Sequence, residues 1–597
     1  MCRVYGFFGN ARISSEMLSN ASKIQFNGGP DSQNVKAGKN WALGNNRLAI
    51  QGLDGGLQPF KSNKIHAVYN GEIYNYKELK DFLVTKGYAF HDNCDGSVII
   101  PLYEIYGENF AMYLDGMFAI AIVDERSKTK LVLASDPCAV KSLYYYWDQV
   151  SDTLYFSSEL LPLFEFPVNK HIRLEAIDEY LIGRSIWHNK TFFKDIYSLG
   201  PSFLLTKTKG YEPKLSQYQS NIKTHLDSSL NFQETAYYFN NLFEEEMLKV
   251  TQADVPICVV TSGGLDSSYI TALASKYIPD LHCFNIAYEG NWPLDERVFA
   301  KEVSHHYDAK YTQVLIKEHE FPQLLKDTIF HLNQPNSAPH ALSTYALFKS
   351  INEAGFKVAI TGEGADEYFG GYERFRKATF NQDINWIEQY FDTMCATTQE
   401  LRNTVYTEDY KKFLDSENHN LLKNAKKEIL LKEKQIGKLK ALLTFDQNER
   451  FPSYILRRVD HLSMANSVEV RVPFCQPRVA SFSKSLPNNF LLNETSVKRI
   501  IYGAAHDKLP QSVLTRPKQP FTLPITAMFN KEHILFDILY ETLNSSSFLS
   551  RNFFNYKNIN SLIDKQINTP CSNTSDILWS IMILELWLQH IDSNISL

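Results

Sequence analysis

The second half of this 597-residue chain alternates short apolar runs with helical patterns. The first unit is an apolar run at Val255–Val260, followed by a Ser-Gly-Gly turn and a helical pattern at Ser268–Tyr277. Buried strands that alternate with helices are typical of parallel sheets covered on both faces. We therefore predict a doubly wound α/β fold here and a mostly helical region up to Leu597. The further predicted elements are strands at His282–Tyr288, Thr312–Ile316 and Lys357–Thr361 and a helix at Asp295–Tyr307.

The N-terminal part has a different pattern, with short apolar runs between Gly, Asn and Asp turns. It predicts packed sheets with helices at Tyr76–Thr85 and Ser97–Tyr106. A polar stretch at Ser216–Ser229 then separates the two halves. We predict domains at 1–210 and 233–597, joined by a linker at 211–232. The predicted N-terminal strands are Val4–Phe8, Trp41–Ala49, Ala67–Tyr69, Phe118–Val123, Leu131–Ala134 and Thr153–Phe156.

The composition excludes several classes of protein. Apolar residues make up 44% and charged residues 21% of the chain, which excludes a mostly disordered protein. The net charge of −6 does not favour nucleic-acid binding. No run of about 18 apolar residues could span a bilayer, and the N-terminus lacks the apolar core of a signal peptide. We expect neither a nucleic-acid nor a membrane partner.

The cysteines and one charged segment provide two further expectations. The eight cysteines form no CxxC pair and no zinc-type cluster, so we expect reduced thiols and a cytoplasmic protein. The Lys-rich segment Leu421–Lys440 is read as a helix with a solvated face, with nucleic-acid or membrane binding as the alternative.

Cys2 is the exception among the cysteines because of its position. Removal of Met1 would make it the first residue, with a thiol nucleophile and a free amine that can take the thiol proton. This is the logic of an N-terminal nucleophile. A cysteine at this position without a catalytic role is the alternative.

Polar residues at the ends of N-terminal strands fit such a nucleophile. Arg47 offers a guanidinium for a carboxylate, and the Asn70 amide with the Gly71 N–H can form an oxyanion hole on a turn. Glu72 and Asp95 supply acceptors for an ammonium group. Together these residues predict a glutaminase site, although Asn70-Gly71 alone also fits an ordinary hairpin turn.

The loop Ser262–Ser268 lies between a predicted strand and a helix. Gly263 and Gly264 allow close approach of phosphate, and the helix N-terminus adds N–H donors. The loop lacks the Gly-Lys-Ser/Thr ending of a Walker A motif and has the form of a pyrophosphate loop. Asp266 would repel phosphate without a cation, so we expect Mg²⁺ there. The alternative is a polar turn with a helix cap.

The loop Thr361–Glu367 follows another apolar strand. Ligands of open parallel sheets bind outside the carboxyl ends of the strands, so both loops are expected to face one crevice. Asp366 could share the Mg²⁺ with Asp266, and Glu363 could act as a base or orient an amine. The alternative is an acidic surface turn.

Together these motifs resemble glutamine-dependent asparagine synthetase. The resemblance continues through Asp460–Ala465, Glu469–Phe474, Lys498 and Arg516–Lys518 to Leu578–Trp587. It implies an N-terminal Ntn-type αββα sandwich, a class II glutamine amidotransferase, joined to an ATP-pyrophosphatase-type synthetase domain. It also implies ATP and Mg²⁺ as cofactors.

The resemblance assigns roles to residues. Arg47, the backbone near Ile50, Asn70, Glu72 and Asp95 would bind glutamine. Glu363 would assist attack of ammonia on an acyl-adenylate, and Lys498 would neutralise phosphate charge. ATP would be held by Thr261, Ser262, Gly263, Gly264, Asp266, Ser267, Ile286, Thr361 and Gly362.

The chain also departs from the family pattern, mostly around the catalytic residues. Asn27–Asp31 replaces His-Arg-Gly-Pro-Asp, and Ser135–Ala139 replaces Arg-Asp-Pro-x-Gly. Gln476 and His461 replace an Asp and an Arg, and Tyr502 replaces an Arg. These three residues and Pro520 are expected near the synthetase crevice, where they would affect the choice of acceptor.

We expect an ATP-dependent amidotransferase with glutamine as donor and aspartate as acceptor, releasing AMP and pyrophosphate. Ammonia would travel through a water-poor passage between the domains. The alternatives are another carboxylate acceptor on a sugar, a peptide or a cell-wall precursor, and a non-catalytic scaffold. A homodimer is one assembly that we consider.

Overall fold

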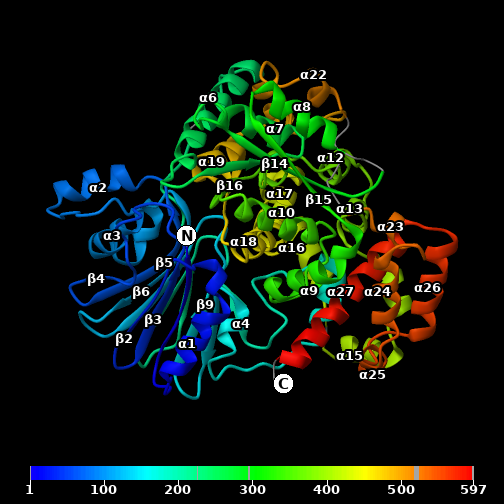
Figure 1. Ribbon diagram of the computed structural model, residues 1–597, viewed down its shortest axis with the longest axis horizontal. Helices are drawn as coiled ribbons and strands as arrows, with labels where there is room; N and C mark the ends of the chain where they lie inside the picture. The colour runs from blue at the N-terminus through cyan, green and yellow to red at the C-terminus, as the bar shows by residue number, and fades with distance from the viewer. Residues whose placement is uncertain (1, 225, 293–295, 418, 517–522, 595–597) are drawn as a thin grey trace.

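The computed structural model describes residues 2–224, 226–292, 296–417, 419–516 and 523–594. Figure 1 shows a sheet-rich N-terminal part beside a mixed α/β part, with a cluster of helices on the far side of the latter. Three sheets organise these parts: two antiparallel sheets of six strands and one parallel sheet of five. The predicted fold class is confirmed.

The N-terminal domain is built on the two antiparallel sheets. The first has the order β10-β8-β9-β1-β3-β2 and the second the order β12-β11-β7-β6-β5-β4. The strands of the first sheet are β1 (Cys2–Phe8), β2 (Ser32–Ala37), β3 (Trp41–Arg47), β8 (Tyr144–Asp148), β9 (Thr153–Ser157) and β10 (Ile196–Ser198). Those of the second are β4 (Phe60–Ser62), β5 (Ile65–Ile73), β6 (Gly116–Asp124), β7 (Lys130–Ser135), β11 (Phe203–Thr208) and β12 (Lys214–Gln217).

Alternating side chains of the two sheets form the core between them. Val4, Phe8 and Leu43 of the first sheet pack with Val68 and Val123 of the second, as expected for strands with period 2. Helices α1 (Ser15–Ile24) and α4 (Leu160–Leu163) contact the first sheet, and α3 (Ile99–Tyr106) contacts the second. The order of layers is therefore αββα.

The C-terminal domain is built on the parallel sheet, in the order β15-β14-β13-β16-β17. The chain adds strands in one direction from β13 and then returns to add β16 on its other side. The reversal creates a crevice at the carboxyl ends of β13 and β16. The strands are β13 (Ile257–Val260), β14 (His282–Tyr288), β15 (Lys310–Ile316), β16 (Val358–Ile360) and β17 (Glu469–Arg471).

Helices cover this sheet and fill the rest of the domain. Helix α7 (Leu265–Ala274) contacts α8 (Arg297–His306), and α10 (Ala341–Glu353) contacts α18 (Arg457–Met464). A π-helical segment, Asp446–Leu456, joins α17 (Lys438–Phe445) to α18. The other helices are α2 (Tyr76–Thr85), α5 (Ala176–Gly183), α6 (Phe232–Val250), α9 (Phe321–Leu332), α11 (Ala365–Phe369), α12 (Glu373–Phe380), α13 (Trp386–Met394), α14 (Gln399–Val405), α15 (Glu408–Ser416), α16 (Leu421–Ile436), α19 (Pro477–Ser485), α20 (Asn488–Leu491), α21 (Arg499–Ala505), α22 (Gln511–Thr515), α23 (Ile525–Met528), α24 (Ile534–Leu543), α25 (Ser546–Arg551), α26 (Tyr556–Asn568) and α27 (Ser572–Asn594).

The structure corrects several predicted boundaries. Asn70 and Gly71 do not form a turn, because β5 continues to Ile73 and pairs with β6 along this length. Helix α7 begins at Leu265, directly after the glycines. The edge strand β12, which pairs with β11, lies within residues 211–232, where the division into domains stays a prediction. The charged segment Leu421–Lys440 is interrupted at Gly437, where φ is +80°.

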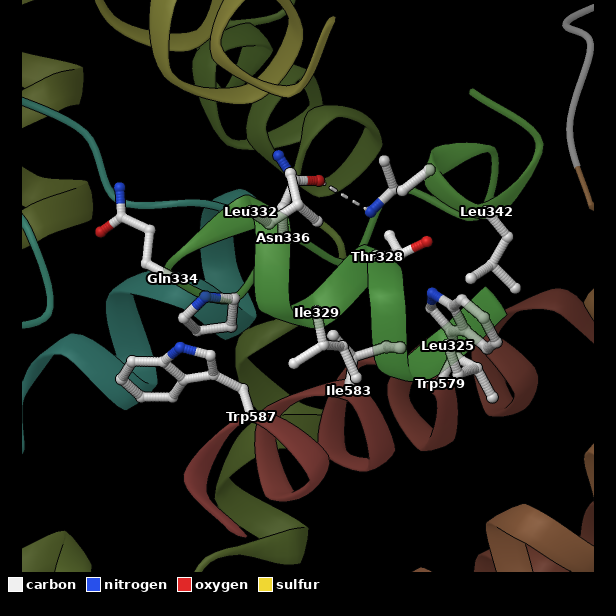
Figure 2. Close-up of a pocket in the computed structure, with 13 residues that line it drawn as sticks. Leu325, Thr328, Ile329, Leu332, Gln334, Asn336, Leu342, Trp579, Ile583 and Trp587 are labelled. Carbon is white, nitrogen blue, oxygen red and sulfur yellow. Dashed lines mark hydrogen bonds between the residues drawn. The ribbon is translucent and has the colours of Figure 1, made fainter. Parts of the chain in front are cut away.

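The last helix, α27, packs on α9 and is linked through the segment that follows α9 to the N-terminal domain. Figure 2 shows Trp579, Ile583 and Trp587 of α27 around a small apolar cavity that α9 lines from the other side. The indole N–H groups of Trp579 and Trp587 donate to the carbonyls of Ser337 and Asn333. The Asn333 side chain accepts from the backbone N–H groups of Leu160 and Leu161 in α4. The segment after α9 therefore connects α27 to the N-terminal domain.

Candidate active sites

The thiol of Cys2 lies in a pocket at the end of the N-terminal sheets. Cys2 is the first residue of β1, opposite Arg47 of β3, and is 3% exposed. The structure brings all the predicted glutamine-binding side chains to this pocket except Asn70, which contacts Cys2 directly. The lining residues are Cys2, Arg47, Leu48, Ile50, Gln51, Gly56, Gln58, Tyr69, Glu72, Cys94 and Asp95.

Asn70 contacts the backbone of Cys2 and has a buried amide nitrogen that is unpartnered in the described part of the chain. The Cys2 backbone nitrogen donates to its Oδ1 at 3.1 Å, while Nδ2 is buried and has no hydrogen-bond partner among the described residues. A buried amide N–H without a partner is what an oxyanion hole requires before its ligand arrives. Gly71 has φ +155°, and a Cβ there would lie 2.1 Å from the Met117 carbonyl oxygen. Only glycine therefore fits beside Asn70.

Gln58 is a site residue that the sequence did not reveal. Its Nε2 donates to the Cys2 sulfur at 3.4 Å, and its Oε1 accepts from the Tyr69 N–H at 2.7 Å. It contacts the thiol from the loop before β4 and is held there by Tyr69 of β5. No local motif marks Gln58, because its role depends on two strands that are distant in sequence.

Two carboxylates and one guanidinium surround the pocket. Arg47 donates to the carbonyl of Gly52 at 2.8 Å, which holds it at the rim. Asp95 accepts from the Tyr69 hydroxyl and from the Ile73 N–H. Burial and the nearby Asp95 raise the pKa of Glu72. The Ile50 carbonyl accepts from the Asp254 N–H at 3.0 Å, so the pocket wall is tied to the C-terminal domain.

Arg471 of β17 reaches the same pocket from the C-terminal domain. Its Nη2 lies 3.5 Å from Glu72, and its Nε lies 2.6 Å from Glu469, with all three side chains buried. Its carbonyl accepts from the Thr361 N–H at 3.0 Å. Arg471 therefore contacts a side chain of the Cys2 pocket and the backbone of the acidic loop after β16. The sequence showed β17 as part of a motif but not as a strand.

The loop after β13 forms a compact nest. Ser267 Oγ accepts from the Ser262 N–H at 3.0 Å, and Ser262 Oγ accepts from the Gly264 N–H at 3.3 Å. Gly263 has φ +71°, and a Cβ there would lie 2.5 Å from the Ala300 nitrogen. The loop leads into α7, whose N-terminus favours anions. The Thr261 carbonyl accepts from Asn285, next to Ile286 on the neighbouring strand β14.

The two acidic loops meet at Lys498. Its Nζ lies 2.5 Å from Asp266 and 2.7 Å from Asp366. Burial would lower the pKa of Lys498, but the two carboxylates outweigh it and raise the pKa above its ordinary value. Carboxylates from separate loops thus converge on one cationic position. That donor set fits Mg²⁺, which binds through one or two carboxylates with phosphate oxygens.

The remaining predicted residues lie around this centre. A Cβ on Gly362 would lie 3.3 Å from the Asp266 Cβ, so the loops are in close contact there. Glu363 Oε2 is buried and has no hydrogen-bond partner among the described residues. Tyr502, one turn after Lys498, has a pKa raised by burial and by the charge of Asp266.

Only some of the departures from the family pattern lie at the crevice. Of the departures that we predicted near the crevice, Tyr502 does lie there. His461 instead packs on Tyr144 of the N-terminal domain, with ring centroids 6.1 Å apart, and lies near the His331 carbonyl. Its pKa is lowered to about 3 by burial and by Arg3. Pro520 and the motif residues Pro517 and Lys518 lie outside the described residues.

Residues beside two other departures meet across the domain interface. Cys138 Sγ lies 2.9 Å from the Tyr368 hydroxyl and 3.3 Å from the carbonyl of Cys475. Gln476 follows Cys475 and is buried. Cys138 and Cys475 therefore take part in the packing between the domains, and a Cβ on Gly364 of the acidic loop would lie 3.0 Å from the Cys475 sulfur.

Arg3, next to the nucleophile, was also not predicted. It donates to Glu159 and to Asp460 of α18, each at 2.8 Å, and Lys141 adds a second cation 3.0 Å from Asp460. A Cβ on Gly28 would lie 2.5 Å from the Arg3 Cγ. The missing side chain at position 28 therefore makes room for Arg3.

The cavity in Figure 2 has a different character from both sites. Its lining is dominated by leucine, isoleucine and tryptophan side chains, and it holds no titratable group that could carry a reaction. Among the described residues, no helix is long and apolar enough to cross a membrane.

Comparisons with known proteins cover both domains. The model of the glutamine amidotransferase domain matches residues 1–219, and the asparagine synthase model matches residues 239–589. Asparagine synthetase [glutamine-hydrolyzing] 1 of Bacillus subtilis is 25% identical over 98% of this chain and 96% of its own length. Asparagine synthetase [glutamine-hydrolyzing] 3 of the same organism is 26% identical over 83% of this chain and 82% of its own. The asparagine synthetase of Brassica oleracea is 30% identical over 72% of this chain and 71% of its own.

Proposed function

Because the chain belongs to the asparagine synthase family and carries a glutamine amidotransferase domain, we propose that it amidates aspartate with the amide nitrogen of glutamine. ATP is cleaved to AMP and pyrophosphate through an acyl-adenylate. The observation that carries this proposal is the meeting of Asp266, Asp366 and Lys498 between two glycine-containing loops. Such a centre suits a bound pyrophosphate group and has no Walker lysine.

In the first half-reaction the Cys2 thiolate attacks the glutamine amide carbon. The free amine of Cys2 takes the thiol proton, and the Asn70 amide with the Gly71 N–H stabilises the oxyanion. Arg47 pairs with the glutamine carboxylate, and Glu72 and Asp95 with its ammonium group. Gln58, which donates to the sulfur, positions the nucleophile.

In the second half-reaction the loops after β13 and β16 hold ATP. The Ser262 nest binds phosphate, and Thr261, Ile286, Thr361 and Gly362 hold the rest of the nucleotide. Asp266 and Asp366 would hold Mg²⁺, which neutralises phosphate charge when bound. Lys498 stabilises the negative charge that develops on the α-phosphate, and Glu363 accepts a proton from the attacking ammonia.

A buried apolar core that is shared by the two domains supports transfer of ammonia inside the protein. Ile50, Met117 and Val140 of the N-terminal domain share one buried core with Phe451 and Ile455 of the C-terminal domain. Ammonia stays unprotonated, and therefore nucleophilic, in such surroundings.

We place the enzyme in the cytoplasm as one chain or as a homodimer. The eight cysteines without disulfides support a reducing compartment. The division into domains at 211–232 stays a prediction, with β12 assigned to the N-terminal domain.

The test is a product assay with the purified protein, MgATP and aspartate, with glutamine or ammonia as donor. We expect asparagine, AMP and pyrophosphate in equal amounts, with one glutamate per asparagine when glutamine is the donor. ADP and phosphate as the main products would contradict the adenylation. Amide formation only with a sugar, peptide or cell-wall carboxylate would replace aspartate as the acceptor.

A further inference from the structure

The π-helical segment Asp446–Leu456 presents cationic side chains beside the synthetase loops. Segments of π-helix are rare and occur frequently at functional sites. Arg450 and Tyr454 lie on this segment, and Arg458 is the second residue of α18. The Cζ atoms of Arg450 and Arg458 lie 4.5 Å and 5.5 Å from the centroid of the Tyr454 ring. Two guanidinium groups therefore lie beside one aromatic ring.

A third guanidinium approaches from the N-terminal domain. Arg184 directly follows α5. Burial lowers the pKa of His340 well below its ordinary value, and the charges of Arg458, Arg184 and Arg450 lower it further. His340 precedes α10, whose N-terminus carries further positive charge. We call the three arginines around His340 the cationic pocket.

The described carboxylates around the cationic pocket are too few to pair with all three arginines. Arg184 pairs with Asp576 at 2.9 Å. Among the described residues, no carboxylate lies within 4.0 Å of the nitrogens of Arg450 or Arg458. Arg450 Nη1, Arg458 Nε and Arg184 Nη1 are buried without a hydrogen-bond partner in this part of the structure. Burial lowers the pKa of Arg458, and its residue is 3% exposed. Buried donors of this kind are ordinarily paired.

The cationic pocket adjoins the proposed adenylation centre on two sides. The charge of Glu363 partly opposes the effect of burial on the pKa of Arg458. Tyr372, whose ring centroid lies 6.0 Å from the Arg450 Cζ, directly follows Gly371. A Cβ on Gly371 would lie 1.9 Å from Asp366 Oδ1 and 2.0 Å from Lys498 Cε. A small acceptor activated beside Lys498 can thus extend towards the arginines.

We propose that Arg450 and Arg458, with Arg184 behind them, bind the non-reacting carboxylate of a dicarboxylate acceptor. The inference rests on the proposed function and names the residues that would hold the second carboxylate of its acceptor. Guanidinium groups pair with carboxylates through parallel N–H···O bonds. A monocarboxylate would leave these donors buried and unpaired, and such losses discriminate between substrates by as much as ~10⁴-fold.

The test compares aspartate with 3-aminopropanoate, which lacks the second carboxylate, in pyrophosphate exchange with MgATP. For the native enzyme we expect kcat/KM to be at least ~100-fold higher for aspartate. In Arg450→Met we expect the KM for aspartate to rise at least ~30-fold, with that for ATP unchanged and little preference between the two acceptors. Arg450→Lys should restore part of the preference. Arg126→Met, which removes a guanidinium 5.8 Å from the Tyr103 ring in the N-terminal domain, is the matched control.

Glutaminase activity and thermal unfolding show whether each variant folds. Equal losses for both acceptors in Arg450→Met, or an unchanged KM for aspartate, would overturn the inference while the proposed function stands. Exchange in the native enzyme with a monocarboxylate and not with aspartate would also overturn it, and would leave the amidotransferase chemistry intact. Absence of exchange with every carboxylate would remove the proposed function and this inference with it.

Discussion

At the scale of single residues, the first residues of the chain serve both domains. Cys2 lines the glutaminase pocket, and Arg3, its neighbour, reaches Asp460 of the C-terminal domain. Successive side chains of a strand point to opposite faces, which explains how adjacent residues serve different partners. Cys2 is therefore directly followed in the chain by a residue that joins the domains.

Cys2→Ala separates the two half-reactions. We expect loss of glutamine hydrolysis by at least ~1000-fold, because Cys94, the other thiol of the pocket, has no free amine of its own and burial and Asp95 raise its pKa. Ammonia-dependent amide formation should remain within a few-fold of the native rate, since the adenylation centre lies in the other domain. Glutamate release and amide formation with ammonium chloride measure the two activities. Glutamine hydrolysis at the native rate would show that Cys2 is not the nucleophile.

Arg3→Met tests the buried charge cluster. Burial would raise the pKa of Asp460, but Arg3 and Lys141 hold it well below its ordinary value. Removing one partner of a buried ion pair costs about 3–5 kcal/mol of stability, which calorimetry should show as a lower Tm. Because the folded-state pKa of Asp460 is depressed, its contribution is present above about pH 4 and fades as the pH falls below that value.

The difference in Tm between native enzyme and Arg3→Met should therefore be largest near neutral pH and shrink in acid. Arg126→Met breaks a partly exposed ion pair with Asp124 and should change stability by about 0–1 kcal/mol. A difference in Tm that does not depend on pH would mean that Arg3 stabilises the interface by packing alone.

At the scale of elements, apolar patterning predicted the sheets but not their ends. The strands and helices of the βα units were found because buried strands are continuous apolar runs. Asn70-Gly71 was placed in a turn because this dipeptide favours one, whereas pairing with β6 keeps it extended. The strand β17 was missed because two of its three residues are charged, whereas β16, which is equally short, is a Val-Ala-Ile run. Gln58, Arg3 and Arg471 were missed because their partners are distant in sequence.

Gly371→Ala tests the loop that follows α11. The added Cβ would overlap Asp366 and Lys498, so one or both must move. Displacing catalytic groups by about 1 Å can cost ~100-fold in rate. We expect pyrophosphate exchange to fall by that factor and glutamine hydrolysis to persist, because Gly371 lies in the C-terminal domain. Native exchange would mean that Asp366 and Lys498 are not needed in this arrangement.

At the scale of the whole molecule, Arg471 connects the two sites. Burial and Asp95 raise the pKa of Glu72, and Arg471 opposes them. In Arg471→Met the carboxyl group should therefore stay protonated to higher pH and lose its attraction for the glutamine ammonium. We expect the KM for glutamine to rise at least ~10-fold at pH 7 and to fall as the pH is raised.

Ammonia-dependent synthesis serves as the control for folding of Arg471→Met. The KM of Arg471→Lys for glutamine should lie between those of Arg471→Met and the native enzyme. A KM for glutamine that stays native across the pH range would show that Glu72 does not need Arg471.

The ion cluster at the domain interface also restricts how such a protein can be recombined. Asp460 in one domain depends on Arg3 and Lys141 in the other, and Arg3 depends on the empty space at Gly28. A chimera that takes its N-terminal domain from a relative would bury Asp460 without its main partner unless the donor supplies an arginine at the position of Arg3 and a glycine at that of Gly28. The residues at these four positions therefore depend on one another. A domain exchange should transfer or redesign Arg3, Gly28, Lys141 and Asp460 together.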